Sequence, residues 1–428
     1  MMPTPSSAAS HFSRSSRRLG VGLAAAAVAA MLALGCAETP APFDAATAPT
    51  PAGPPTPLAT KTEPVPSVEP ASATLAPTPT AAPSSAATAD AEKAAAFRSL
   101  IERLSEPNGN FFSDNFISNE TSYLQIADRL PGVVPTGGAY VGVGPEQNFT
   151  YIALTQPKLA FIVDVRRDNM VLHLMYKALF DLAQDRAHFL ALLTGRDYAP
   201  KGVDVPSLKE ALDIVAAAEA TEDSFRAAHL AVRTRLIDGY GFTLDDSDGR
   251  SLRRAHRAFF DDGLDIRFTL KEASWRKYPS LRELVVATAP SGRKLGFLAT
   301  DEHFRRIQRM HRQHRIVPVV GNFGGDRTFT AIGRHLETND LTLRTLYVSN
   351  VEQYLMVDGL WSKWQRNVAA LPADDRSVFI RGYLDQGRRH PQQMAGHRTA
   401  TTLHRVADFN ARKRPYGSMY LLATDGVI

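Results

Sequence analysis

Residues 139–148 read Ala139-Tyr140-Val141-Gly142-Val143-Gly144-Pro145-Glu146-Gln147-Asn148, which predicts a short buried strand followed by a glycine turn. The next residues, 149–154, predict a brief helix, and the apolar run from Leu159 to Val165 predicts a second strand. A strand, a turn, a helix and another strand form one right-handed βαβ unit. Both strands are apolar on both faces, as a parallel sheet covered by helices requires.

The parallel pattern resumes later in the chain. We expect strands at 316–320 and 343–348, and last strands at 377–380 and 419–422. Few strand-like runs occur between about 184 and 275, so this stretch is interpreted as a helical insertion. The fold class predicted is therefore α/β, a Rossmann-like, mostly parallel sheet with a helical insertion. Helices are expected at 97–104, 122–130, 170–181, 208–218 and 328–336.

The N-terminus has the three parts of a secretory signal. A positive region holds Arg14, Arg17 and Arg18, and an uncharged stretch of small and apolar residues leads to Cys36. The residues before this cysteine resemble the lipobox of bacterial lipoproteins, although Ala33 stands where that motif usually has leucine. The resemblance implies a signal peptide over 1–36, lipidation of Cys36, and a domain held at a bacterial membrane outside the cytoplasm. Which membrane, and whether export is by the general or the twin-arginine route, stays open.

Residues 37–90 are almost entirely Pro, Ala, Thr and Ser. Such a composition cannot bury enough apolar area to offset the entropy of ordering. We expect a disordered tether, followed by one globular domain over 91–428. The tether would hold that domain away from the membrane.

Charge and cysteine content exclude several classes of function. The net charge of +5 includes the three leader arginines, and without them it is +2, so no nucleic-acid partner is expected. With one cysteine the chain forms no intrachain disulfide. The histidines show no H-E-x-x-H spacing, so no metal site is expected. A G-x-S-x-G elbow and a phosphate-binding G-x-x-x-x-G-K loop are also missing from the sequence.

Ligands of open α/β sheets bind beyond the carboxyl ends of the strands. Four predicted strand ends carry unusual residues. Gly142 and Gly144 would let the backbone approach a ligand closely, and Asp164, at the end of the next strand, suits the two hydroxyls of a ribose. Later strand ends carry substrate-side candidates: Asn322, Phe323, Asn350, Glu352 and Tyr354.

The glycine turn with Asp164 resembles the first motif and the following acidic position of Rossmann methyltransferases that use S-adenosylmethionine. Residues 318–323 resemble their later, substrate-side strand end, and the resemblance covers roughly 110–385. It implies S-adenosylmethionine as a cofactor, with Gly142, Gly144, Glu146, Asp164 and Asn322 as its binding residues. Glu146 departs from the pattern, because it replaces the usual third glycine. Its carboxylate could crowd a ligand or face the positive sulfonium.

Two hypotheses of function follow. The first is methyl transfer to an unknown substrate, for which the sequence does not identify a catalytic base, since alignment of the reactants supplies much of the acceleration. The second is a non-enzymatic envelope module that uses the same fold to bind a small ligand or a protein partner. The second gains weight from the compartment, because S-adenosylmethionine is made in the cytosol. A filled space over Gly142 and Gly144 would favour it.

Overall fold

The computed structural model describes residues 85–198, 205–269, 278–385 and 387–428. The predicted signal peptide, Cys36 and most of the predicted tether lie outside these residues. Residues 86–428 form one compact unit. Its first helix, α2 (Ser85–Leu104), begins six residues before the expected start of the domain, so residues 85–90 are helical and do not belong to a disordered tether. None of the helices in the described part is long and apolar enough to cross a membrane.

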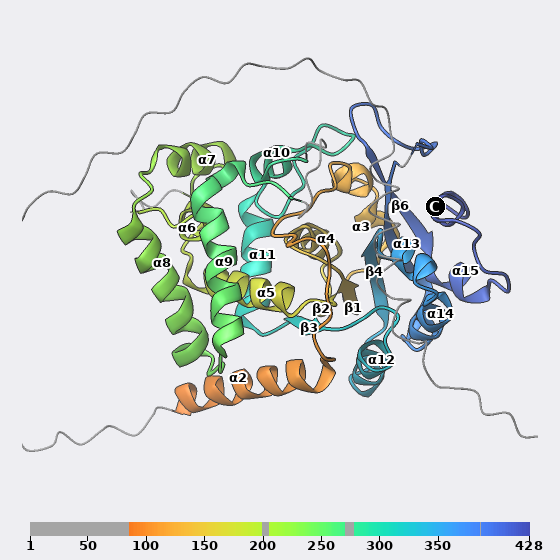
Figure 1. The fold of residues 1–428 in the computed structure, drawn as a ribbon, viewed down its shortest axis with the longest axis horizontal. Helices are drawn as coiled ribbons and strands as arrows, with labels where there is room; N and C mark the ends of the chain where they lie inside the picture. Colours follow the sequence, from red (N-terminus) through yellow and green to blue (C-terminus); the bar gives the residue numbers. More distant parts are fainter. Residues whose placement is uncertain (1–84, 199–204, 270–277, 386) are drawn as a thin grey trace, which may run out of the picture. The chain divides into compact units, whose positions relative to one another are not determined.

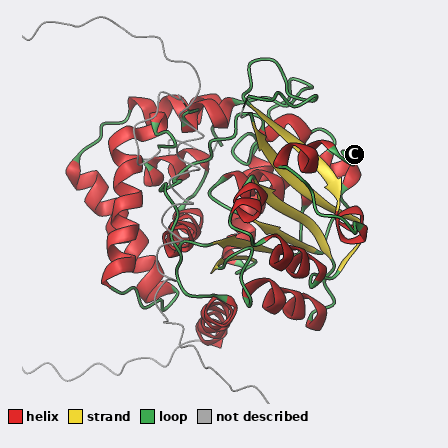
Figure 2. Ribbon diagram, turned by 45° about the vertical axis from the view of Figure 1, so that its right-hand side comes forward, coloured by secondary structure: helices red, strands yellow, loops and turns green. Residues whose placement is uncertain are grey.

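A six-stranded sheet forms the centre of this unit, in the order β3-β2-β1-β4-β5-β6 (Figures 1 and 2). The first five strands are parallel and β6 pairs antiparallel with β5. The fold is therefore Rossmann-like α/β, as predicted. The strands are β1 (Ala139–Gly142), β2 (Leu159–Asp164), β3 (Ile316–Val320), β4 (Leu343–Ser349), β5 (Ala373–Leu384) and β6 (Thr399–Arg405).

The register brings the predicted site residues to one edge of the sheet. Gly142, the last residue of β1, pairs with Ile162, which lies two residues before the end of β2 at Asp164. Asp164 in turn pairs with Val320, the last residue of β3. The carboxyl ends of β1, β2 and β3 are thus neighbours.

Helices cover both faces of the sheet, on opposite sides in Figure 1. Helices α4, α5 and α11 lie on one face, where α5 packs against β2 and β3. Helices α12 to α15 lie on the other, where α15 packs against β5. Their bounds are α4 (Gln147–Thr155), α5 (Arg167–Leu182), α11 (Asp301–Arg312), α12 (Thr328–Thr338), α13 (Val351–Val357), α14 (Trp361–Ala369) and α15 (Val406–Ala411).

The regular elements in the described part of the expected insertion are helices joined by loops, and they pack beside α5 rather than on the sheet. Helices α7 and α10, the second of which follows the expected end of the insertion, begin with a capping box of a serine and a glutamate three residues later, and α8 begins with one of Thr221 and Ser224. Its elements are α6 (Arg186–Leu193), α7 (Leu208–Ala217), α8 (Glu222–Thr234), η2 (Arg235–Gly239), α9 (Asp246–Asp262), η3 (Gly263–Asp265) and α10 (Leu281–Val286).

Most expected strands and helices are confirmed, with two exceptions. The helix expected over 122–130 is a short 3-10 turn, η1 (Tyr123–Ile126), followed by α3 (Leu130–Val133). The last strand expected at 419–422 is wrong, because that stretch is helix α16 (Met419–Thr424). The side chain of Ser418 accepts a hydrogen bond from the N–H of Leu421 and caps this helix. The true last strand, β6, is rich in threonine and lacks the apolar run that a buried strand was expected to show.

A buried ion pair joins α13 to β5. Arg381 Nε lies 2.6 Å from Glu352 Oε2, and Trp364 Nε1 donates to the other carboxylate oxygen at 2.9 Å. The arginine and glutamate side chains are 2% and 0% exposed. Each charge is therefore tolerated only because its partner is present.

We predict that Arg381→Met lowers the free energy of unfolding by about 3–5 kcal/mol, because it leaves a charged Glu352 buried without a partner. Urea denaturation followed by circular dichroism measures this loss. The double substitution Arg381→Met with Glu352→Gln should recover about half of it, since no charge is then buried. Equal losses in the single and double variants would contradict this account.

Candidate functional site

The chain runs outward from β1 through β2 to β3, and then crosses to the other side of β1, where β4, β5 and β6 follow. The strand order therefore reverses between β1 and β4. Such a switch point opens a crevice beyond the carboxyl ends of the strands, where ligands of this fold class bind. The turn that carries Gly144 leaves β1 at this point.

The side chain of Asn148 holds the glycine turn together. Its Nδ2 donates to the carbonyl oxygens of Val143 at 2.9 Å and Pro145 at 2.8 Å, while Tyr140 donates to its Oδ1 at 2.9 Å. Gly142 is required beneath it, because a Cβ there would lie 2.0 Å from Asn148 Oδ1. The space over Gly142 is therefore filled by the chain itself.

Gly144 differs from Gly142. It is buried, with a φ of +79°, and apart from its chain neighbours no heavy atom lies within 4 Å of where a Cβ would stand. Every other glycine of the described chain with such open space beside it is exposed. No described side chain outside its chain neighbours therefore packs against the Cα of Gly144.

Two side chains of α5 hold the carbonyl of Gly144. His173 Nε2 lies 2.8 Å from this oxygen and Asn169 Nδ2 lies 3.4 Å from it. A carbonyl only accepts, so both nitrogens donate. Burial lowers the pKa of His173 to about 4, so the ring is neutral and its Nδ1 carries no proton. This Nδ1 and Asn169 Oδ1 are buried acceptors for which the described residues offer no donor.

Asp164 lies at the end of β2 as expected, but both of its oxygens are engaged. Arg166 Nε and Nη2 each donate to the carboxylate at 2.9 Å, and the backbone N–H of Arg166 adds a third bond. The same guanidinium donates to the carbonyls of Ser113 and Asp114. A ribose could reach this carboxylate only after Arg166 moved.

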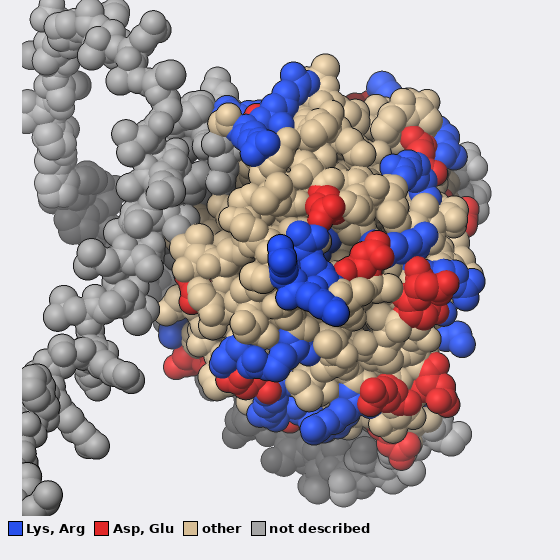
Figure 3. All heavy atoms as spheres, turned by 90° about the vertical axis from the view of Figure 1, so that its right-hand side faces the viewer, with Lys and Arg blue, Asp and Glu red and all other residues tan. Residues whose placement is uncertain are grey.

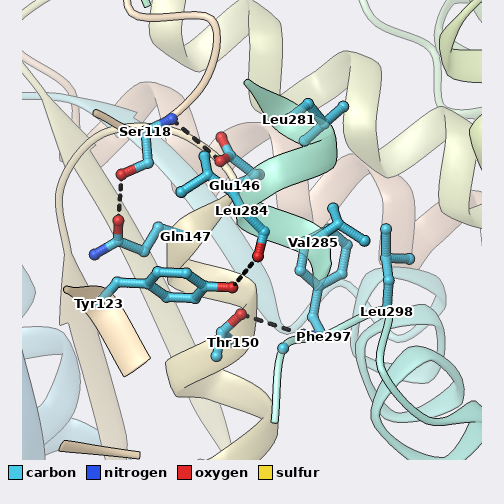
Figure 4. Close-up of a pocket in the computed structure, with 11 residues that line it drawn as sticks. Ser118, Tyr123, Glu146, Gln147, Thr150, Leu281, Leu284, Val285, Phe297 and Leu298 are labelled. Atoms are coloured by element: carbon cyan, nitrogen blue, oxygen red, sulfur yellow. Dashed lines mark hydrogen bonds between the residues drawn. The ribbon is translucent and has the colours of Figure 1, made fainter. Parts of the chain in front are cut away.

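Glu146 precedes α4 and faces a small cavity, shown in Figure 4. The N–H of Ser118 donates to its Oε1 at 3.1 Å, while Oε2 is buried with no partner among the described residues. The cavity has an open volume of about 20 Å³, enough for about one water molecule. Burial raises the pKa of Glu146 to about 7 from its usual 4.5. The carboxylate therefore lines a cavity of its own, next to the turn.

A second buried carboxylate, Glu120, lies over the ends of β4 and β5. Tyr347 donates to it at 3.0 Å, and Ser349 and Gln147 donate to it as well. Gly382 of β5 is required below, since a Cβ there would lie 2.9 Å from the carboxylate. Burial raises the pKa of Glu120. Only neutral groups contact this carboxylate in the described hydrogen bonds.

Both carboxylates involve one segment, residues 105–122, which we call the strap. The strap contains Glu120, and its Ser118 N–H donates to Glu146. It has no regular secondary structure and crosses the carboxyl edge of the sheet after α2; Figure 1 shows its course in orange. Its contacts follow the order of the strands. They are Glu106 N–H to Val320 O at β3, Gly109 N–H to Val165 O at β2, Ser118 to Glu146 at β1, Glu120 to Tyr347 at β4, and Ser122 to Thr399 at β6.

Glu106 fixes the start of the strap. Its carboxylate accepts from the backbone N–H of Asn322, after β3, at 3.1 Å. It also accepts from the N–H groups of Arg327 and Thr328 at 2.9 and 2.7 Å, and these two bonds cap the start of α12. Gly325 is required here, because a Cβ would lie 2.5 Å from the carboxylate.

Three aromatic rings join the strap to α13. Tyr354 lies 5.5 Å from Phe111 and 6.1 Å from Phe112, measured between ring centroids. The strap residues follow the β2 contact, and Tyr354 follows β4. The contact therefore joins segments that follow the strands on either side of β1, and we call the three rings the aromatic roof. Phe112 is 41% exposed.

The other predicted residues have local partners. Asn322 Oδ1 accepts from the N–H of Gly324 at 2.8 Å, and Phe323 is buried 5.2 Å from the ring of Trp364. Asn350 is hydrogen-bonded to Tyr354, at the aromatic roof. Glu352 is held in its ion pair with Arg381. The structure thus brings Gly144, Asp164 and Tyr354 to one edge and turns Phe323 and Glu352 into the core.

Sequence reasoning missed the strap and the two side chains on Gly144 O. The signal for the second was present: Asn169 and His173 are four residues apart on a helix that starts after β2, so they share a face. The strap carries no periodic pattern from which its course could be predicted.

Within the described ranges no group of three or more His, Cys, Asp and Glu residues is placed to hold a metal ion. On the face shown in Figure 3, lysines and arginines lie among aspartates and glutamates. Charges of one sign do not dominate that face.

The raised pKa of Glu146 predicts a dependence of stability on pH. Between its usual 4.5 and about 7, the folded chain keeps a proton that the unfolded chain has released. Stability therefore falls as pH rises through this window, by about 3 kcal/mol in total. Glu146→Gln, which keeps an acceptor for Ser118, should remove this loss and be more stable than the parent chain at pH 8.

Denaturation by urea at a series of pH values tests this, with the difference between variant and parent as the readout. Glu337→Gln, on the exposed side of α12, is the matched control and should change nothing. A difference between Glu146→Gln and its parent that stays constant from pH 5 to pH 8 would refute the prediction.

Comparison with curated proteins finds no match. A family model does match residues 115–419, which include all six strands and the second part of the strap, from residue 115 on. The matched region is well over half of the chain, which therefore belongs to the family described as Domain of unknown function (DUF7790).

Proposed function

We propose that the domain binds S-adenosylmethionine at the carboxyl edge of β1 and β2 and transfers its methyl group to a substrate. The observation that carries the proposal is Gly144 itself, a buried glycine with a φ of +79° at the switch point of the sheet, against which no described side chain outside its chain neighbours packs. Bound there, the cofactor would supply an electrophilic methyl group on a sulfonium.

The two side chains on the carbonyl of Gly144 support a ligand rich in hydrogen-bond donors. Asn169 Oδ1 and His173 Nδ1 are buried acceptors without partners, and a buried polar atom without a partner costs free energy until a ligand or water satisfies it. Gly144 lets the backbone approach such a ligand closely. Hydroxyl and amino groups are the donors that match these acceptors.

Asp164 would hold the ribose hydroxyls after Arg166 had released the Asp164 carboxylate. The carboxylate lies at the end of β2, the strand beside β1, and its partner Arg166 donates in turn to carbonyls of the strap. Entry of the ligand would thus exchange guanidinium donors for hydroxyl donors on the same two oxygens. Two oxygens that accept side by side suit a diol as well as a guanidinium.

Isothermal titration calorimetry with S-adenosylhomocysteine tests the proposal. We expect binding by the parent chain and a loss of affinity of about tenfold or more in Asp164→Asn, because the amide offers one acceptor oxygen in place of two. Asp248→Asn is the matched control: Asp248 also binds an arginine, Arg167, through both oxygens, but on α9. Equal affinity in both variants, or no binding by the parent chain, would exclude the proposed site.

One observation favours the second function, a non-enzymatic binding module. Arg166 occupies both oxygens of Asp164, and Asn148 fills the space over Gly142. A module of this kind would use the edge to fix the strap and would present the strap's exposed surface to a partner. Titration without any heat from S-adenosylhomocysteine, by a chain that is folded, would favour this reading.

We also propose that the domain is carried at a bacterial membrane by lipid on Cys36. The support is the lipobox-like sequence before this cysteine and the positive leader. Two or three acyl chains exceed the single chain that gives only reversible membrane binding.

Labelling of growing cells with a palmitate analogue tests the anchor. We expect label in the parent chain, recovered with membranes, and no label in Cys36→Ala. A Cys36→Ala chain that still sediments with membranes would contradict anchoring through this residue.

A further inference from the structure

We infer that a cleft on the β5 side of the carboxyl edge binds an organic acid, a molecule with an apolar body and a single negative charge. Segments that are far apart in the chain line this cleft: Thr121 of the strap, Arg267, the stretch from Tyr278 to Ala287 that includes α10, and His397 before β6. The inference goes beyond the proposed function and does not depend on S-adenosylmethionine.

The first support is the size and position of the cleft. It has an open volume of about 660 Å³, which lies within the range of about 300–1,000 Å³ that is usual for small-molecule sites. Thr399, the first residue of β6, pairs with Leu384, the last residue of β5, and His397 comes just before this pair. The cleft therefore lies beyond the carboxyl end of β5, on the edge where ligands of open α/β sheets bind. Arg267 and Glu283 in its wall are 44% and 58% exposed, so the cleft is open to solvent on their side.

The second support is the apolar character of much of the wall. Leu284 is buried, and its carbonyl accepts from the hydroxyl of Tyr123 at 2.7 Å, which fixes α10 beside the cleft. Four of the lining residues are largely apolar: Tyr278, Pro279, Leu284 and Ala287. Such a wall favours a ligand whose body is apolar, because both surfaces then leave water.

The third support is the guanidinium of Arg267. Its described hydrogen bonds use Nη1 alone, which donates to Glu283 Oε2 at 2.9 Å and to the carbonyl of Tyr278. These bonds leave Nε and Nη2, two parallel donors that match the two oxygens of a carboxylate. A β-bridge to Ser280 also holds the backbone of Arg267 in place.

Glu283 limits the charge of the ligand. Its Oε2 accepts from the N–H of Ser280 at 2.6 Å, in the capping box of α10, and from Arg267. The backbone bond from Ser280 and the bond from Arg267 hold the pKa of Glu283 below its usual value, so the carboxylate is ionised. The pair of Arg267 and Glu283 is then neutral as a whole. A neutral pair suits a ligand with one negative charge better than a polyanion.

His397 supplies a second donor. Its Nδ1 lies 3.1 Å from Oγ1 of Thr121. When the threonine hydroxyl donates to Nδ1, the neutral ring carries its proton on Nε2, which can then donate to the ligand. The polar contacts thus come from two distant segments, while the apolar wall lies in and around α10.

Fluorescence titration with anilinonaphthalene sulfonate tests the inference, because this dye joins an apolar body to a single negative charge. We expect one saturable site in the folded full chain. Arg267→Gln should lower the affinity about tenfold, since the amide carries no charge and cannot form the paired bonds. Arg282→Gln is the matched control and should change nothing: Arg282 lies in α10 and pairs with Asp265, but it does not line the cleft.

The neutral dye phenylnaphthylamine separates the apolar body from the charge. It should bind the parent chain and Arg267→Gln equally well. Ala287→Trp should lower the affinity for both dyes about tenfold or more, because the larger side chain takes up part of the cleft. Circular dichroism of each variant shows whether it is folded, and if Ala287→Trp is not, the two arginine variants still decide.

Equal affinity of the anionic dye for Arg267→Gln and the parent chain would overturn the inference. A folded Ala287→Trp that binds both dyes as the parent does, or a parent chain without a saturable site, would overturn it as well. These results are separate from the titration with S-adenosylhomocysteine, so the cleft and the proposed function can fail independently.

Discussion

The hydrogen bonds between the strap and the strand ends are the constraint on which the rest of this edge depends. A parallel sheet presents a row of strand ends and turns at its carboxyl edge, where backbone groups need partners. Here one segment, held by Glu106 at β3 and Glu120 at β4, supplies many of those partners. Because its contacts follow the strand order, the strap fixes the position of each turn relative to the next.

Much of the fold could be predicted from the sequence, because parallel strands buried on both faces are continuous apolar runs. This was enough for β1 to β4 and for the helical character of the insertion. It was not enough for β6, whose threonines are buried although they are polar. Two of them, Thr399 and Thr401, are hydrogen-bonded to Ser122, and the strand pairs antiparallel with β5. An apolar pattern does not report burial that depends on a partner distant in the chain.

The candidate site was predictable to the same degree. Strand ends are visible in the sequence, so Gly144 and Asp164 could be placed at one edge. The partners of the carboxylates were not visible in the sequence. Asp164 is bound by Arg166, two residues later in the chain, and Glu352 of α13 is bound by Arg381 of β5. Whether a carboxylate awaits a ligand or already has an arginine depends on rotamers and on segments such as the strap, and neither is encoded in a local motif.

The direct connection of α2 to the strap has a mechanical consequence. Any tension that reached the N-terminus of the domain would enter through α2, whose Phe97 packs against Phe242 and against the amino group of Lys177. Next in line would be Glu106 at the β3 end, followed by the remaining contacts in sequence. Load applied in this direction peels contacts one by one, and peeling requires less force than shearing all of them together. A chain pulled from its N-terminal side would therefore lose the contacts of the strap before the sheet itself yielded.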